Sequence, residues 1–189
     1  AIMLMEAQEE EWDELEFMAR EFQNAFMGLK FAPKPVVVAP YGLTLGGGYE
    51  LCAVADRVVA AAESYVGLVE VGVGVIPGAG GNKEMLIRGL EGLPAGVQVD
   101  TQPILNRIFE TIATAKVATS AREAQEMGYL RPTDVIVVNK DHQLYEAKQA
   151  VLALEAAGYR PPEPALIPVA GPEGRAVLEM GAYGMFLGG

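Results

Sequence analysis

The chain has 189 residues, 51% apolar and 21% charged, which is enough for one domain with a sizeable core. Its net charge of −11 disfavours nucleic acid and anionic membranes as main partners, and no apolar run is long enough to span a membrane. A single cysteine excludes an internal disulfide and a cysteine zinc site, and a single histidine excludes any site that needs two. We therefore expect a cytoplasmic protein.

Helices and short strands alternate in the first half of the chain. Apolar residues at spacings of three and four predict an amphipathic helix, and two prolines follow it. Apolar runs bounded by proline or glycine predict short buried strands, and glycine-rich stretches precede short helices. The expected elements are a helix at 8–29, a strand at 35–40, a helix at 49–54, a strand at 57–61 and a helix at 81–88.

The second half continues the alternation. Ser120 opens a capping-box sequence, and Gly128 and Gly158 each follow a helical pattern as stop signals. The expected segments are a loop at 89–101, helices at 104–117, 121–127 and 141–157, a strand at 134–138, an extended connector at 160–172 and an apolar tail at 176–189. This pattern predicts an α/β fold, and the short strands and glycine turns favour a spiral of small ββα turns over a doubly wound sheet.

Two glutamates set among glycines form the candidate site. Glu50 closes a run that contains Gly46-Gly47-Gly48, and Glu70 opens a second glycine-rich run twenty residues later. Glycine lets a ligand approach the backbone, and the N–H groups that begin the following helix would stabilise a carbonyl oxygen gaining charge. Two carboxylates there suit acid and base chemistry. The residues alone leave open a glycine-rich turn before a buried helix, and an exposed strand-end carboxylate at Glu70.

Other motifs carry weaker signals. The segment 72–78 superficially resembles a dinucleotide fingerprint, but Pro77 stands at its third glycine position, so nucleotide binding there is disfavoured. The remaining reactive or charged side chains are interpreted as structural: Lys83 and Arg88 as a solvated helix face, His142 as a surface residue at a helix start, and Cys52 as a small core residue.

Four ordered segments resemble the enoyl-CoA hydratase (crotonase) family, namely 34–51, 55–56, 67–70 and 76–81, and residues 113–130 resemble a later helix of that family. The added loop before that helix, and the variant Asn82-Lys83-Glu84-Met85, are similar to the hydratase part of bifunctional 3-hydroxyacyl-CoA dehydrogenase/enoyl-CoA hydratase proteins of fatty-acid β-oxidation. The resemblance implies a crotonase-like ββα spiral core over 1–160. Residues 161–189 would be a connector and the start of a C-terminal helical extension.

The resemblance also implies roles for particular residues. Glu50 and Glu70 match the catalytic glutamates that activate water and deliver a proton across the double bond of a 2-enoyl-CoA. Gly47 matches the glycine whose N–H holds the thioester oxygen, and the expected substrate contacts are Gly46, Leu45, Pro77 and Gly78. Both glutamates together favour hydration, since an isomerase need not keep Glu50. Hydration needs no metal or cofactor, and NAD would serve only a dehydrogenase part outside this chain.

One departure from the family concerns the region ahead of the chain. The family's second oxyanion donor and much of its CoA contact come from an N-terminal ββα region that would precede Ala1. We therefore expect a piece of a larger enzyme, weak or inactive alone, with an acyl-CoA substrate and the rest of the polypeptide as partner. A homo-oligomer is expected, since crotonase relatives are commonly trimers. The alternatives are double-bond isomerisation and a non-catalytic structural domain with the same fold.

Overall fold

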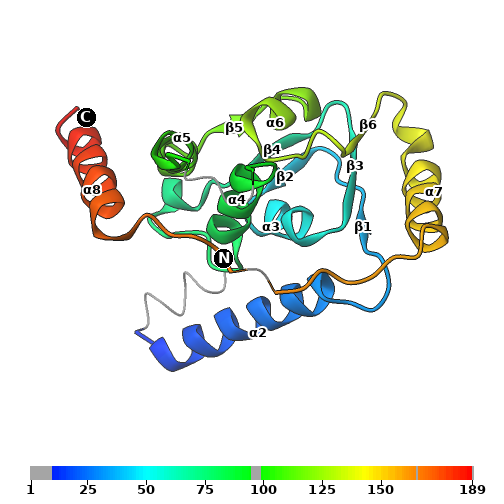
Figure 1. Cartoon of the computed structure of the whole chain (residues 1–189), viewed down its shortest axis with the longest axis horizontal. Helices are drawn as coiled ribbons and strands as arrows, with labels where there is room; N and C mark the ends of the chain where they lie inside the picture. Colours follow the sequence, from blue (N-terminus) through cyan, green and yellow to red (C-terminus); the bar gives the residue numbers. More distant parts are fainter. Residues whose placement is uncertain (1–9, 95–98, 165, 189) are drawn as a thin grey trace.

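The computed structural model describes residues 10–94, 99–164 and 166–188 (Figure 1). Helices alternate with short strands throughout, as expected of the α/β class. The first half comprises α2 (Trp12–Lys30), β1 (Val37–Val38), β2 (Leu43–Leu45), α3 (Gly47–Val54), β3 (Arg57–Ala61), β4 (Tyr65–Gly67), the 3-10 turn η1 (Glu70–Val73) and α4 (Gly81–Leu90). The second comprises α5 (Gln102–Ala113), β5 (Val117–Ala118), α6 (Ala121–Met127), β6 (Val135–Val137), η2 (Lys140–His142), α7 (Gln143–Ala156) and α8 (Gly171–Gly188).

The strands form two small sheets, ordered β1-β3-β6 and β2-β4-β5. β1 pairs in parallel with β3, placing Val37 opposite Arg57, and β2 pairs in parallel with β4, placing Leu43 opposite Tyr65. Each turn of the chain therefore lies beside the next at an offset of 20 to 22 residues. This arrangement confirms the predicted spiral of small ββα turns.

A buried apolar cluster joins helices α3, α4, α5 and α6 to both sheets. Tyr49 of α3 packs edge-on against Tyr129, with ring centroids 4.8 Å apart, and both side chains are fully buried. The Tyr129 hydroxyl donates to the carbonyl of Lys116 at 2.7 Å. A Cβ on Gly67 would lie 2.8 Å from that same carbonyl, so only glycine fits where β4 meets β5. The close approach of these strands fixes the segment that leads to Glu70.

Some predicted boundaries are wrong. The helix expected to reach residue 117 ends at Ala113, because Ala115 turns with φ = 48° and Val117 then enters β5. The strand expected over 35–40 consists of Val37 and Val38, which are only half-buried. Strands β2 and β4 were not expected, since each has three residues and ends at or before glycine. Expectations for residues 1–9 and 95–98 lie outside the described residues.

The interpretation of Arg88 as a solvated residue is also wrong. Its side chain is buried, and its guanidinium donates to the carbonyls of Cys52, Ala53 and Tyr129. These backbone acceptors offset part of the cost of burying the charge, while Nε has no hydrogen-bond partner among the described residues. Cys52 is a buried core residue and His142 is exposed, as predicted.

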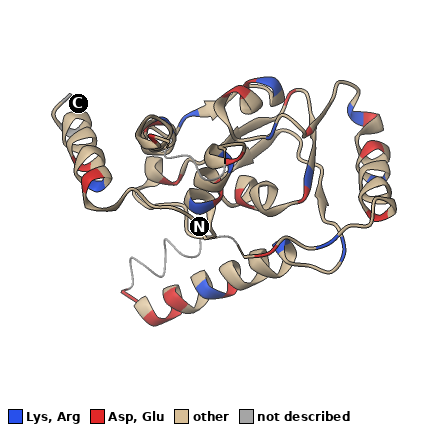
Figure 2. Cartoon of the chain, in the orientation of Figure 1, with Lys and Arg blue, Asp and Glu red and all other residues tan. Residues whose placement is uncertain are grey.

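Charged residues are spread along several helices rather than gathered in one element (Figure 2). The exposed ion pair of Lys34 with Glu155 joins the segment before β1 to α7. Between Gly158 and α8 the described residues form no helix or strand, and α8 lies at one end of the molecule beside α5 (Figure 1). Within the described ranges, no helix combines the length and apolar character needed to cross a bilayer.

Candidate active site

Glu50 is held at the meeting point of two helices. It lies in the first turn of α3 and is 4% exposed. Its Oε1 accepts the backbone N–H groups of Ala79 at 3.0 Å and Gly81 at 2.8 Å. Gly81 begins α4, so the carboxylate also lies at the positive end of that helix dipole. Both bonds go to one oxygen, which fixes the position of the carboxylate.

Glu70 has a different environment. It opens η1 and is half-buried, and its Oε2 is buried without a hydrogen-bond partner among the described residues. Burial raises the pKa of Glu70, and the negative charge of Glu50 raises it further, against a lowering by backbone N–H groups. The charge of Glu50 therefore acts on Glu70, and the two predicted carboxylates have unequal surroundings, one held by two N–H groups and the other with an oxygen that has no partner among the described residues.

The glycine run supplies backbone donors beside these carboxylates. Gly46 has φ = 56°, and its N–H donates to the carbonyl of Gly67 at 2.9 Å, which joins the end of β2 to the end of β4. Helix α3 begins at Gly47, and the first N–H groups of a helix have no intrahelical acceptor. Gly47 is exposed, and a Cβ there would meet nothing within 4 Å. Its N–H is thus available to a ligand, beside half-buried Leu45.

Pro77 and Gly78 lie in the loop that leads to α4. Pro77 is buried, while the exposed Gly78 accepts a hydrogen bond through its carbonyl from Gln23 of α2 at 2.8 Å. The next residue, Ala79, donates to Glu50. These contacts show how the loop is held between α2 and Glu50. A direct substrate contact for Pro77 or Gly78 stays a prediction.

Sequence reasoning missed the two residues that fix Glu50. Ala79 and Gly81 act through backbone N–H groups, which have no residue signature. One signal was present, because Gly81 follows another glycine at the start of a predicted helix. A Cβ on Gly81 would lie 3.0 Å from Oε1 of Glu50 and 2.8 Å from the Leu68 side chain, so close packing explains that glycine.

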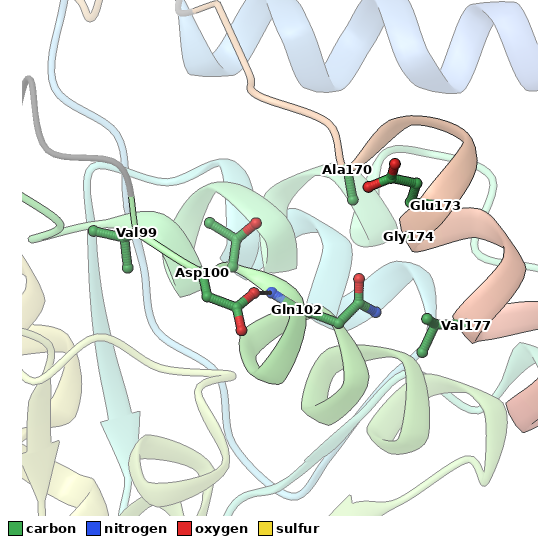
Figure 3. A pocket seen from close by; sticks show the side chains of 8 residues that line it. Val99, Asp100, Gln102, Ala170, Glu173, Gly174 and Val177 are labelled. Carbon is green, nitrogen blue, oxygen red and sulfur yellow. Dashed lines mark hydrogen bonds between the residues drawn. The ribbon is translucent and has the colours of Figure 1, made fainter.

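A hollow of about 530 Å³ lies elsewhere, between the start of α5 and α8 (Figure 3). Asp100 and Glu173 contribute acidic groups there, and the Asp100 carboxylate accepts the N–H of Gln102 at 3.0 Å. None of its lining residues belongs to the segments that carry Glu50 or Glu70. The described residues contain no cluster of side chains suited to bind a metal ion. The glutamate pair is therefore the candidate site, and the hollow is not.

The chain is similar to known proteins in sequence and in fold. Residues 3–92 match the family described as Enoyl-CoA hydratase/isomerase. The whole chain is 48% identical to 23% of a Bacillus subtilis protein named "Probable 3-hydroxyacyl-CoA dehydrogenase". About a third of it (35%) is 41% identical to 27% of a Syntrophomonas wolfei crotonyl-CoA hydratase. The crystal structure of an enoyl-CoA hydratase from Bacillus anthracis superposes with a TM-score of 0.60 at 26% identity, covering 76% of this chain and 48% of that one. The chain thus spans only part of each relative.

Proposed function

We propose that the protein to which this chain belongs adds water to the double bond of a 2-enoyl-CoA thioester, because residues 3–92 match the family described as Enoyl-CoA hydratase/isomerase. The product is a 3-hydroxyacyl-CoA. The observation that carries this proposal is the unequal setting of two carboxylates beside the free N-terminus of α3. One is fixed by two N–H groups, and the other is half-buried with an oxygen that has no hydrogen-bond partner among the described residues. Hydration needs one group of each kind.

The proposed reaction uses three groups of this chain. Glu50 accepts a proton from a water molecule as the water oxygen bonds to Cβ of the substrate. Glu70, whose burial favours the proton-bearing form, gives a proton to Cα. The thioester oxygen gains negative charge as the enolate develops and accepts the N–H of Gly47. Gly46, Leu45, Pro77 and Gly78 are proposed to line the path of the substrate.

The burial of Glu50 and its two hydrogen bonds favour hydration over isomerisation. Moving a double bond requires one carboxylate that shuttles a proton, and Glu70 alone would serve. Glu50, which is buried and accepts two hydrogen bonds, would then have no chemical role. Analysis of the products formed from a 3-enoyl-CoA distinguishes the two reactions. An isomerase converts this substrate to the 2-enoyl-CoA, whereas an enzyme that only hydrates 2-enoyl-CoA leaves it unchanged.

We further propose that this chain acts within a longer, cytoplasmic, oligomeric enzyme of fatty-acid β-oxidation. The Bacillus subtilis relative is named as a dehydrogenase, and 3-hydroxyacyl-CoA, the product of hydration, is the substrate for such a step. NAD would serve that part and not residues 1–189. A second donor to the thioester oxygen would come from the rest of the polypeptide. Residues 1–160 would form the hydratase core, and 161–189 the connection to a helical extension.

The test compares the longest natural polypeptide with the 189-residue chain. Hydration of crotonyl-CoA is followed by loss of the conjugated enoyl absorbance. We expect turnover by the long form, and turnover slower by about 10²-fold or more in the chain alone, because each oxyanion donor contributes on that scale. Butyryl-CoA titration measures binding by both. A long form that binds acyl-CoA but hydrates none would overturn the proposal, and one that neither binds nor hydrates would support a structural domain instead.

A further inference from the structure

Helix α4 contacts α3 at three positions along one face. The N–H of Gly81 donates to Glu50, the sulfur of Met85 lies 3.0 Å from the Tyr49 hydroxyl, and Arg88 donates to the last turn of α3. Residues spaced by four and then three share a helix face, and all three are buried. The two helices are therefore joined from the first turn of α3 to its last.

Arg88 makes the contact at the C-terminal end. Its Nη2 lies 3.1 Å from the carbonyl oxygen of Cys52 and 3.0 Å from that of Ala53, and its Nη1 lies 2.6 Å from that of Tyr129. The last carbonyls of a helix lack intrahelical donors and form the negative end of its dipole, so a guanidinium there is favourable. Arg88 is 8% exposed, and its charge is partly balanced by Asp134, whose Oδ2 lies 4.0 Å away.

The opposite end of α3 carries the proposed chemistry. Gly47 and Glu50 lie in its first turn, while Cys52 and Ala53 lie in its last. An eight-residue helix is about 12 Å long, so a side chain bound at its C-terminus does not reach the reacting atoms. A helix this short moves as one body. Holding its C-terminal carbonyls therefore fixes the position of the N–H group and the carboxylate at its other end.

We propose that Arg88 is a positioning residue for the reaction. It anchors the C-terminus of α3 and so sets the place of the Gly47 N–H and of Glu50. The proposal rests on the function proposed above. The planar guanidinium reaches carbonyls in two directions at once, on α3 and on Tyr129. A lysine would keep the charge but lose this two-way geometry.

Amide hydrogen exchange tests the anchoring directly and needs no substrate. The variants are Arg88→Met and Arg88→Lys, with Arg122→Met of α6 as the control, because the Arg122 side chain is 75% exposed. In Arg88→Met we expect exchange in α3 to rise by about tenfold more than exchange in β3, the change that local loosening produces. Arg88→Lys should recover part of the protection, and Arg122→Met should match wild type. Equal increases in α3 and β3 would show general destabilisation and overturn the proposal.

Kinetics of the hydrating polypeptide provide the second readout. In Arg88→Met we expect kcat for crotonyl-CoA to fall by about 10- to 100-fold with KM within about twofold, since small misplacement of catalytic groups acts on the chemical step. In Arg88→Lys the kcat should fall less. If Arg88→Met does not fold, hydrogen exchange and kinetics are both measured on Arg88→Lys. An Arg88→Lys variant with the same exchange and the same kcat as wild type would overturn the proposal.

The two proposals fail in different ways. If the proposed function is wrong, the wild-type protein hydrates no enoyl-CoA, yet the exchange pattern still reports whether Arg88 anchors α3. If the positioning role is wrong, wild type turns over and Arg88→Met has the same kcat as Arg122→Met.

Discussion

The carboxylate of Glu70 lies over the backbone of Gly46, so close that a Cβ on Gly46 would be 3.3 Å from Oε1. The two residues belong to successive turns of the spiral, which the parallel pairing of β2 with β4 brings side by side. The turn that begins α3 and the turn that carries the second glutamate therefore depend on each other. A side chain at Gly46 would act on both.

Gly46→Ala is expected to destabilise the protein by about 1 kcal/mol or more, because φ = 56° is costly for any residue with a Cβ. It should also displace Glu70 and weaken hydration. Gly47→Ala is the matched control, since a Cβ at Gly47 meets nothing within 4 Å and leaves the backbone N–H in place. Thermal denaturation of both variants checks the difference. Equal melting temperatures would contradict this account of Gly46.

Glu50→Gln is expected to preserve the fold and abolish most hydration. The two N–H groups bind one oxygen, and the glutamine side-chain oxygen can accept both. Loss of the carboxylate removes the base, which contributes about 10²- to 10⁴-fold to the rate. Glu50→Ala leaves both N–H groups without their acceptor, and should cost about 1–3 kcal/mol of stability for each one left unsatisfied. Circular dichroism melts and hydration rates separate the two effects, and an active Glu50→Gln enzyme would refute the role of Glu50.

Glu70 predicts a specific dependence of stability on pH. Its pKa is raised in the folded protein above the ordinary value of 4.5 by burial, so folding favours its protonated form. The resulting stabilisation is complete below pH 4.5 and is lost as the pH rises through the raised pKa. The melting temperature of wild type minus that of Glu70→Gln should therefore decrease as the pH rises from about 4 to 7. Glu63→Gln, at an exposed position, is the control, and parallel curves for wild type and Glu70→Gln would contradict the prediction.

A buried ion pair ties α2 to α4. The Lys30 ammonium lies 2.7 Å from both carboxylate oxygens of Glu84, whose side chain is fully buried, and Lys83 lies 3.3 Å from one of them. Lys30→Met should lower the free energy of unfolding by about 3 kcal/mol, because it leaves a buried charge without its main partner. Adding Glu84→Met should restore much of the loss. Arg20→Met, which breaks an exposed pair with Glu16, should change stability by less than about 1 kcal/mol. Denaturant titration compares them, and additive losses in the double variant would contradict the coupling.

The candidate site could be proposed from the sequence because it is marked by residue types that stand out there, namely glycines and glutamates. The run Gly46-Gly47-Gly48 marked the start of α3, and the two glutamates stood beside glycine-rich backbone. What fixes Glu50 could not be predicted in the same way. The donors are main-chain N–H groups of Ala79 and Gly81, and any residue other than proline carries such a group.

Arg88 shows a related limit. An arginine in a short helix is usually solvated, and its sequence neighbours gave no reason to expect otherwise. Its acceptors are carbonyls of Cys52, Ala53 and Tyr129, which lie 35 to 41 residues away and again have no residue signature. The missed strands β2 and β4 have the same explanation, because their pairing is set by neighbouring turns of the spiral and three residues carry too little pattern.

The parallel offsets of the strands also bear on the order in which the chain folds. Closing β1 onto β3 brings together residues 20 apart, whereas closing β3 onto β6 joins Val59 to Val135, 76 apart. The longer closure costs about 1 kcal/mol more in chain entropy. The turns that carry Glu50 and Glu70 can therefore assemble first as a local nucleus, with β6 docking afterwards on a surface that is already formed.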